Sequence, residues 1–283
     1  HNRFIPLTAL ALGIAGALTF GQAHASGFQL KENSVKAMGR AFAGSGVAKG
    51  DASVVVNNPA TMTQFDETTA QVDMTVIDLN AEFEGSGYAG VGLGPAAAPL
   101  TGGQGGDIGE PTPVPAMSFI HKFDNGLTFG AMVSAPFGLK TEYDKNWVGR
   151  YSSTKSDVKT VDVTLSAAYE IVLDRFSVGV GLVYEQAEAT LDNSIDFGTI
   201  MLGAGVPGAR PQSADGSVSV QGDDHGLGWI LGLNWRPTDS LAFGFTHRSE
   251  IDHELRGRAD FTLPASFAGA QPGFAALAAH PLA

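Results

Sequence analysis

Hydrophobic and polar side chains alternate with a period of two along most of the chain from Thr68 onward. In residues 160–171 (TVDVTLSAAYEI), the odd positions are apolar and most even positions are Thr, Asp, Ser or Glu. Such alternation predicts a β-strand with one apolar and one polar face. Several runs exceed the five or six residues of a typical globular strand and match the about nine to eleven residues of a tilted membrane strand. Six further strands are predicted at residues 70–84, 116–123, 127–135, 176–191, 218–235 and 241–261.

Short and long connections alternate between the predicted strands. Residues 124–126, 173–175 and 236–240 form short connections. The connections at residues 85–115, 136–157, 192–217 and 262–283 are long. Outer-membrane barrels have short periplasmic turns at one end and longer outer loops at the other. The pattern therefore predicts an all-β protein that forms a transmembrane antiparallel β-barrel.

A secreted β-sandwich is the alternative, because its strands also present two unlike faces. The polar face of this chain carries Asp162, Glu185 and Arg248. A sandwich core could not hold such charges unpaired. In a barrel the same face lines the lumen, so we favour the barrel.

The first 25 residues have the layout of a secretory signal peptide. Arg3 precedes an apolar run at residues 4–20, and Ala23-His24-Ala25 places small residues at the cleavage positions. The run is shorter than the about 20 residues of a membrane-spanning helix. We expect cleavage after Ala25 and a mature protein outside the cytoplasm.

Composition narrows the possible partners of this 283-residue chain. Its formal charge of −12 argues against nucleic-acid binding, which requires a basic surface. The chain has no cysteine, so neither disulfides nor thiolate metal sites are available. Glycine is abundant, with 37 residues, and hydrophobic residues make up 43% of the chain, which does not suit a disordered protein.

Residues 26–66 differ from the alternating part of the chain. Residues 34–42 could form one short helix, and several glycines and the turn residues 57–60 interrupt the rest. We expect a compact, irregular N-terminal plug rather than a domain with its own core.

Seven blocks of residues carry a resemblance to a known family: 27–30 (GFQL), 39–44 (GRAFAG), 58–60 (NPA), 65–66 (FD), 135–143 (APFGLKTEY), 147–151 (WVGRY) and 246–250 (THRSE). In this order, the series resembles the FadL family of outer-membrane channels for long-chain fatty acids and other hydrophobic compounds. The last block departs from the family in having His247 where the family often has tyrosine.

The resemblance implies a barrel of about fourteen strands with an N-terminal hatch, or plug, in its lumen. This chain is similar to roughly the first half of that pattern. We therefore expect a signal peptide at 1–25, the hatch at 26–66 and a transmembrane barrel at 67–283 that is incomplete at its C-terminus.

The resemblance also implies passive transport of long-chain fatty acids or similar hydrophobic compounds across the outer membrane of a Gram-negative bacterium. Capture at apolar outer loops would precede transfer to a lumen pocket and hatch-gated release through the barrel wall. A channel for monoaromatic hydrocarbons and a structural or adhesive barrel are the alternatives. We expect a monomer in contact with the lipid bilayer, without cofactor or metal. We expect no enzymatic activity, because no Gly-x-Ser-x-Gly elbow occurs.

Apolar residues in the hatch and in two long loops are the candidates for substrate binding, since apolar patches of this kind mark binding surfaces. The candidates are Phe28, Phe42 and Pro59 in the hatch, Phe197, Ile200, Met201 and Leu202 in the third loop, and Phe267, Phe274 and Leu277 in the fourth. The alternative is that the two loops pack only on each other.

Residues with conformational freedom or a side-chain amide are the candidates for hatch movement and anchoring: Gly27, Gly44, Asn57, Asn58, Pro59 and Ala60. Of these, the two asparagines could anchor the hatch to strand backbones.

A carboxylate ligand would need a cation near its pocket. Lys140, Arg150 and Arg248 are the candidates. Each could instead form a salt bridge with a nearby acid: Glu142, Asp144 or Glu250.

Overall fold

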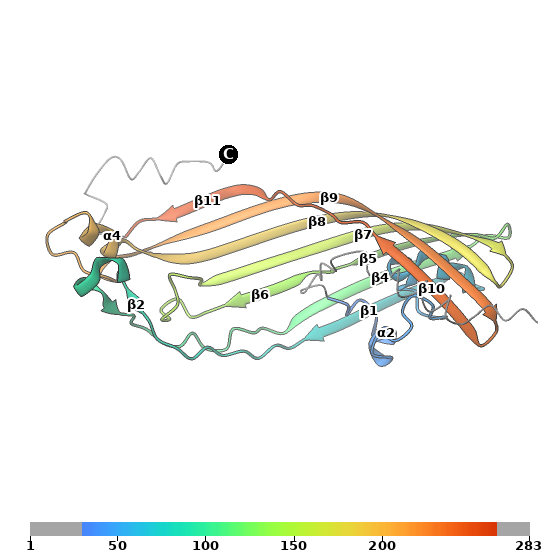
Figure 1. Ribbon diagram of the computed structural model, residues 1–283, viewed down its shortest axis with the longest axis horizontal. Coiled ribbons are helices and arrows are strands. Elements are labelled where there is room, and N and C mark those ends of the chain that lie inside the picture. The colour runs from blue at the N-terminus through green and yellow to red at the C-terminus, as the bar shows by residue number, and fades with distance from the viewer. Residues whose placement is uncertain (1–29, 265–283) are drawn as a thin grey trace, which may run out of the picture.

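The computed structural model describes residues 30–264, and an antiparallel sheet dominates them (Figure 1). Its strands are β1 (Thr69–Ile77), β4 (Thr112–Lys122), β5 (Leu127–Ser134), β6 (Gly138–Glu142), β7 (Lys155–Val172), β8 (Phe176–Asp196), β9 (Asp215–Thr238), β10 (Leu241–Arg248) and β11 (Arg256–Thr262). The sheet order is β1-β4-β5-β7-β8-β9-β10, while β6 also pairs with β7 and β11 also pairs with β9. Neighbours in the sheet are neighbours in the chain, as in an up-and-down barrel.

Short helices and a small two-stranded sheet complete the described chain. They are α2 (Val35–Gly39), α3 (Val54–Asn57), η1 (Pro59–Gln64), η2 (Val91–Ala96), α4 (Phe197–Gly203), β2 (Tyr88–Ala89) and β3 (Ala98–Pro99). Among residues 30–264, no helix is both long and apolar enough to cross a membrane.

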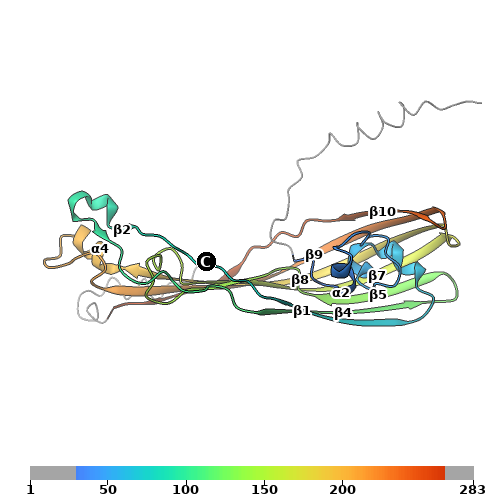
Figure 2. The same cartoon turned by 90° about the horizontal axis from the view of Figure 1, so that it is seen from below.

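The sheet curls around the N-terminal helices at the end with the short turns (Figure 2). At the other end, β7, β8 and β9 run on toward α4 and β2 (Figure 1). We call residues 30–65, which include α2, α3 and η1, the plug segment, and the face of the sheet that it contacts the inner face. An apolar cluster joins the two: Ala52, Val54, Val55, Val56, Met62 and Phe65 of the plug segment with Ala116, Ile120, Met132 and Ala168 of the sheet.

The two faces of the sheet have the polarity of a membrane barrel. The outer face exposes large apolar side chains, such as Leu182, Leu227 and Trp235. The inner face buries polar ones, such as Thr164 and Asn234. A soluble sandwich would have the reverse arrangement. The structure therefore confirms the all-β fold class and the barrel-type antiparallel sheet.

The apolar outer surface covers only part of the long strands. On β8 the outward positions are apolar from Phe176 to Tyr184 and become polar at Gln186, Glu188 and Thr190. The apolar span matches the length of a tilted membrane strand. The remainder of β8 extends beyond the apolar band, toward the long loops.

The last predicted strand, 241–261, is wrong as a single strand. Arg248 pairs with Ile230 and Arg256 pairs with Asp223, so residues 249–255 leave the β9 ladder. We call residues 249–255 the inward bulge, because Ile251 lies over the inner-face glycines Gly226 and Gly228 of β9. The absence of side chains there leaves room for the bulge.

Several other strand boundaries differ from the prediction: β4, β7 and β9 begin three to five residues earlier and β8 ends five residues later, and two further differences concern whole segments. β1 ends at Ile77 rather than at residue 84. The predicted loop 136–157 contains β6, which pairs with residues 155–159 of β7. In both cases the pairing partner, which the sequence pattern does not specify, decides where the strand ends.

Candidate functional site

Four inner-face glycines form the seat of the plug segment. They are Gly130, Gly179, Gly232 and Gly244, one each on β5, β8, β9 and β10. A Cβ atom at Gly179 would lie 2.6 Å from the carbonyl carbon of Pro59, and one at Gly232 would overlap Asn58 Oδ1. Only glycine allows the backbones to approach this closely. Part of the glycine excess therefore serves plug packing.

Side chains from five strands bond to the plug segment next to this seat. The bonds are Lys122 Nζ to Thr63 O (2.8 Å), Ser166 Oγ to Val55 O (2.9 Å), Ser177 Oγ to Ala60 O (2.8 Å), Asn234 Nδ2 to Thr61 Oγ1 (2.8 Å) and Thr246 Oγ1 to Asn57 O (2.8 Å). They satisfy polar groups that would otherwise be buried without partners.

Asn58 links the plug segment to β9. Its Nδ2 donates to Leu233 O at 2.9 Å and to Gly46 O at 2.8 Å, and its Oδ1 accepts from the Ala60 N–H. Among residues 30–264, the side-chain amide of Asn57 bonds only within the segment, to Ser53 Oγ. The contacts of Asn58 are those of an anchoring residue.

The other predicted plug residues occupy unlike positions. Pro59 and Ala60 are buried against the wall, so Pro59 does not face an open lumen. Phe42 is half-buried and takes φ 61°, while Gly44 takes φ 66°. Gly27 and Phe28 lie outside the described residues.

A carboxylate that the sequence analysis missed organises the plug segment. Asp51 accepts from Arg40 Nη2 at 2.7 Å and from the hydroxyls of Ser34 and Ser53, each at 2.8 Å. Burial alone would raise the pKa of Asp51, but these hydrogen bonds outweigh it and hold the pKa below its ordinary value. The short spacing from Asp51 to Ser53 is the sequence signal that could have indicated this site.

β1 holds the other side of the plug segment. Gln71 Oε1 accepts from the Ala52 N–H at 3.1 Å, and Asp73 Oδ1 accepts from the Val35 N–H at 2.9 Å. Gln71 Nε2 also donates to Asp73 Oδ2 at 2.8 Å, which connects the two contacts.

Beyond the plug, toward the long loops, five charged side chains cross the inner face. Asp162 and Glu185 are cross-strand partners. Arg248 Nη2 lies 2.5 Å from Asp162 Oδ2. From the inward bulge, His253 contacts Glu185 Oε1 through Nε2 at 2.9 Å and Asp224 Oδ2 through Nδ1 at 3.2 Å. We call these five residues the charged layer.

The candidate cations for a carboxylate ligand all have acidic partners. Lys140 contacts Glu110 at 2.7 Å and Glu142 at 3.2 Å. Arg150 contacts Asp215 at 2.9 Å. Arg248 pairs with Asp162 in the charged layer, so all three candidate cations form salt bridges, as the alternative in the sequence analysis expected. Of their acidic partners, only Glu142 is one that the sequence analysis named.

The sheet has a break in its hydrogen-bond ladder between β4 and the chain that joins β5 to β6. Pairing between β4 and β5 ends at Met117–Val133. Within residues 30–264, residues 112–116 pair only with β1, and β6 pairs only with β7. Pro113, Pro115 and Pro136 cannot donate to a ladder here.

The end of the plug segment reaches this break. The Leu30 N–H donates to Pro136 O at 2.7 Å. The Phe137 N–H donates to Thr160 Oγ1 at 3.1 Å, and Thr160 is the cross-strand partner of Ala187. The break therefore lies one inward-facing position beyond the Asp162–Glu185 pair, on the side away from the glycine seat and the plug helices, and only the N-terminal end of the plug segment extends to it.

An apolar row connects the edge of the break with the middle of the inner face. Leu139 of β6 pairs with Val158 of β7, which pairs with Ala189 of β8. These positions continue the inward phase of Thr160, Asp162 and Ala187. On the outer side of the break, Val76 of β1 is exposed.

The third long loop contacts the first one. Leu93 approaches Gly203 of α4, and Gln212 bonds to the backbone of Thr101 and of Pro99. Phe197 is buried, Ile200 is 46% exposed, and Met201 and Leu202 are half-buried. The fourth-loop candidates Phe267, Phe274 and Leu277 lie outside the described residues, so contact between the third and fourth loops stays a prediction.

Comparison with known proteins gives consistent matches. The model of the family described as "Outer membrane protein transport protein (OMPP1/FadL/TodX)" matches residues 16–280. The long-chain fatty acid transport protein of Escherichia coli (strain K12) is 27% identical over 276 residues, covering 92% of this chain and 59% of that protein.

Solved structures show the same fold. The crystal structure of a Pseudomonas aeruginosa FadL homologue has a TM-score of 0.77 at 25% identity, covering 90% of this chain and 60% of that chain. The CymD monoaromatic hydrocarbon channel has a TM-score of 0.51 at 19% identity, covering 79% and 55%.

The chain spans a little over half the length of the curated relatives it matches. The family match covers more than half of the chain and agrees with the blocks that carried the resemblance. The chain belongs to the OMPP1/FadL/TodX family and is a protein of the outer membrane of Gram-negative bacteria.

Proposed function

We propose that the full-length protein carries hydrophobic molecules passively across the outer membrane, with long-chain fatty acids as the leading class. The family match and the name of the Escherichia coli relative support transport of such compounds. We further propose that residues 26–66 act as a hatch that prevents straight passage through the lumen, because five strands bond to this segment.

The ladder break at residues 135–137 is the observation that carries the proposed route. A hydrophobic molecule moving down the inner face would meet the charged layer before it reached the plug, and apolar groups gain nothing from such a surface. The break lies on the loop side of that layer. Leu139 and Val158 form an apolar approach to it, and the exposed Val76 lies on its outer side. A sideways exit into the membrane therefore avoids the charged layer.

In this route the outer loops capture the molecule first. Ile200 on α4 and Val91 on η2 are exposed at the tip of two loops that contact each other. Burial of apolar surface in such a patch is favourable by about 25 cal/mol per Å². The plug contributes through Leu30, whose bond to Pro136 couples the N-terminal segment to the break.

Neutral hydrocarbons are the second candidate class. The observation that favours them is the pairing of Lys140, Arg150 and Arg248 with acidic side chains. None of these three cations is available to a carboxylate without the loss of an existing ion pair.

Uptake of labelled oleate and labelled toluene tests the function. The full-length protein would be expressed in cells that lack their own hydrophobe channel, with an empty vector as the baseline. We expect oleate uptake to rise above the baseline more than toluene uptake. Toluene-selective uptake would assign the protein to the hydrocarbon class. If neither rises while the barrel is folded and inserted, the transport proposal fails and a structural or adhesive role replaces it.

A further inference from the structure

The outer surface of β8 and β9 carries two hollows, one apolar and one polar. The apolar hollow has a volume of about 460 Å³, and the outward side chains around it include Phe129, Leu165, Ala167, Val180, Leu182 and Trp229. The polar hollow has a volume of about 430 Å³, and its outward side chains are Gln186, Glu188, Thr190, Gln221, Asp223 and Arg258. Both volumes lie within the range of about 300–1,000 Å³ that is usual for ligand sites.

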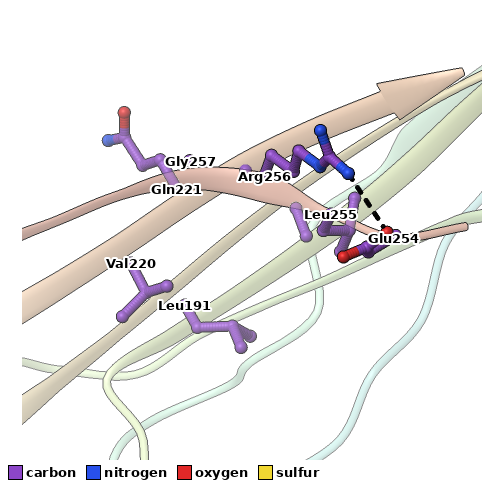
Figure 3. Close-up of a pocket in the computed structure, with 9 residues that line it drawn as sticks. Leu191, Val220, Gln221, Glu254, Leu255, Arg256 and Gly257 are labelled. Carbon is purple, nitrogen blue, oxygen red and sulfur yellow. Dashed lines mark hydrogen bonds and ion pairs between the residues drawn. The ribbon is translucent and has the colours of Figure 1, made fainter. Parts of the chain in front are cut away.

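The polar hollow belongs to the outside of the wall and not to the lumen. Glu188 and Thr190 continue the outward phase of β8, and their cross-strand partners on β9 are Asp223 and Gln221. Figure 3 shows Gln221 on the side of the strands opposite to Val220, whose side chain faces the inside. A ligand in the polar hollow therefore contacts the outside of the barrel wall.

The two hollows lie at different depths relative to the membrane. The apolar one lies within the apolar band, and the cross-strand pair Tyr184–Leu227 separates it from the polar one. The ring centroid of Tyr184 lies 6.0 Å from that of His225, and aromatic side chains mark the membrane interface of barrels. Leu182 and Glu188 are six residues apart, or about 20 Å of strand. The polar hollow therefore lies at the level of an outer-leaflet headgroup whose acyl chain reaches the apolar hollow.

A row of charges crosses four strands at the level of the polar hollow. Lys159 of β7, Glu188 of β8, Asp223 of β9 and Arg256 of β11 are successive cross-strand partners. The two cations stand at the ends of the row, three strand spacings or about 14 Å apart. Lys159 pairs with Glu188 and Arg256 pairs with Glu254, but both pairs are exposed, so competing anions replace them at small cost. Among residues 30–264, the carboxylate of Asp223 has no hydrogen bond or ion pair.

The side chains of the polar hollow select the class of headgroup. A phosphate in the centre of the hollow would be repelled by Glu188 and Asp223. Sugar hydroxyls both donate and accept, so these carboxylates and the amide of Gln221 can satisfy several of them. Phosphates at the ends of the saccharide would instead meet Lys159 and Arg256. The row is therefore complementary to a saccharide that carries phosphate at both ends.

We propose that this outer surface binds a phosphorylated glycolipid of the outer leaflet, with its saccharide in the polar hollow, its phosphates at Lys159 and Arg256 and one acyl chain in the apolar hollow. The apolar hollow contributes shape rather than affinity, because lipid chains are as apolar as the side chains that line it. The headgroup therefore provides the selectivity. The site faces the membrane and not the lumen, so it goes beyond the proposed function and does not take the transported molecule.

Titration of the full-length protein with three lipids tests the proposal, with binding measured by native mass spectrometry. The probes are lipid A with both phosphates, its dephosphorylated form, and phosphatidic acid, which is anionic but has no saccharide. We expect diphosphorylated lipid A to bind about tenfold more tightly than phosphatidic acid, and the dephosphorylated form to fall between them. Equal binding of lipid A and phosphatidic acid would overturn the saccharide assignment.

Two substitutions separate the saccharide from its phosphates. Asp223→Ala should weaken binding of both forms of lipid A about fivefold, because the sugar loses an acceptor, and should not weaken binding of phosphatidic acid. Lys159→Gln should weaken binding of the diphosphorylated form alone. The matched controls are Asp239→Ala and Arg175→Gln, an exposed ion pair at the short turns, at the opposite end of the strands. Equal effects of Asp223→Ala and Asp239→Ala would overturn the polar hollow as the headgroup site.

Ala167→Phe tests the apolar hollow independently of charge. The ring fills the hollow, so binding of diphosphorylated lipid A should fall about threefold. Met74→Phe is its control, because Met74 is exposed on the outer surface of β1, away from both hollows. Unchanged binding in Ala167→Phe would overturn the placement of the acyl chain. Thermal unfolding of each variant verifies that the barrel is folded, and a failure of the proposed function would appear in the uptake assay and not in these titrations.

Discussion

The inner face of one curled sheet serves two purposes in two regions. At the end with the short turns, Gly179 and Gly232 bring the strand backbone into direct contact with the plug. Toward the loops, Ala189, Leu191 and Val220 line open space instead. The same alternation of inward and outward residues produces both regions. The comparison teaches that inward glycines lie where another segment of the chain packs against this face, which is the plug in one region and the inward bulge in the other, while larger inward side chains line the open space.

The charged layer separates the two regions. Glu185 lies between Gly179 and Ala189 on β8, and His253 reaches it from the inward bulge. A bulge in an antiparallel ladder re-aims side chains and ends pairing. Here it brings a histidine to the layer and a leucine to the open space.

The largest expected effect comes from filling the plug seat. Gly232→Val would place side-chain atoms where Asn58 and the Ala60 N–H now lie. Overpacking of this kind costs about 1–3 kcal/mol or more, so the plug should leave its seat. Thr61 is fully buried while the plug is seated. Maleimide labelling of a cysteine introduced at Thr61, in a chain without native cysteines, therefore measures whether the plug has left its seat.

Gly39→Ala is the control for that experiment, because a Cβ atom at Gly39 meets nothing within 4 Å. It should leave Thr61 protected. If Gly232→Val also left Thr61 protected, close backbone packing would not be what holds the plug.

The next largest effect concerns the amide anchors. Asn58→Ala removes the bonds to Leu233 O and Gly46 O and leaves both carbonyls without that partner. Loss of such buried bonds costs about 1–3 kcal/mol. Hydrogen exchange of plug amides should accelerate accordingly. Asn57→Ala, the adjacent control, removes only the bond to Ser53 Oγ and should change exchange little. Equal acceleration in both variants would contradict the anchoring role of Asn58.

A smaller effect is expected from acidification. The folded pKa of Asp51 is lowered, so its contribution to plug stability is complete above about pH 4 and is lost as the pH falls through the folded value. Plug amides should therefore exchange faster, relative to intrinsic rates, at the lowest pH that the barrel tolerates. Asp51→Asn should weaken the plug at neutral pH and remove this pH dependence. A pH dependence that persisted in Asp51→Asn would assign it to another group.

The smallest effect on stability is expected at the outer loops. Ile200→Ser should leave thermal unfolding unchanged, because Ile200 is 46% exposed, but should slow oleate uptake at low concentration. Phe197→Ala, three residues earlier, removes a buried ring and should destabilise the loop. Identical uptake by Ile200→Ser and the wild type would remove Ile200 from the capture surface.

Much of the fold could be predicted from the alternation of residues. The run at 160–171 became the centre of β7, and the alternating short and long connections gave the up-and-down order. The polar inner residues Asp162 and Glu185 correctly favoured a lumen over a sandwich core. These features depend on local period and on polarity, which a single sequence displays directly.

The features that the sequence did not reveal depend on register between distant strands. Nothing near residues 249–255 indicates that the opposing part of β9 carries Gly226 and Gly228, which make room for the inward bulge. The pairing of His253 with Glu185 also follows from register, across 68 residues. Prolines 113, 115 and 136 were visible, but their effect appears only when β4 and β5 are aligned.

A reversible crosslink across the ladder break tests the central claim, which is sideways exit on the loop side of the charged layer. Val114→Cys and Pro136→Cys would be joined in the full-length protein by a short bifunctional thiol reagent that a reductant releases. Phe119→Cys and Ala131→Cys, which are cross-strand partners on β4 and β5, form the control pair. The account predicts that oleate uptake falls when the first pair is joined, recovers on reduction and is unaffected by the control pair. Full uptake with the first pair joined, verified by mass, would contradict it.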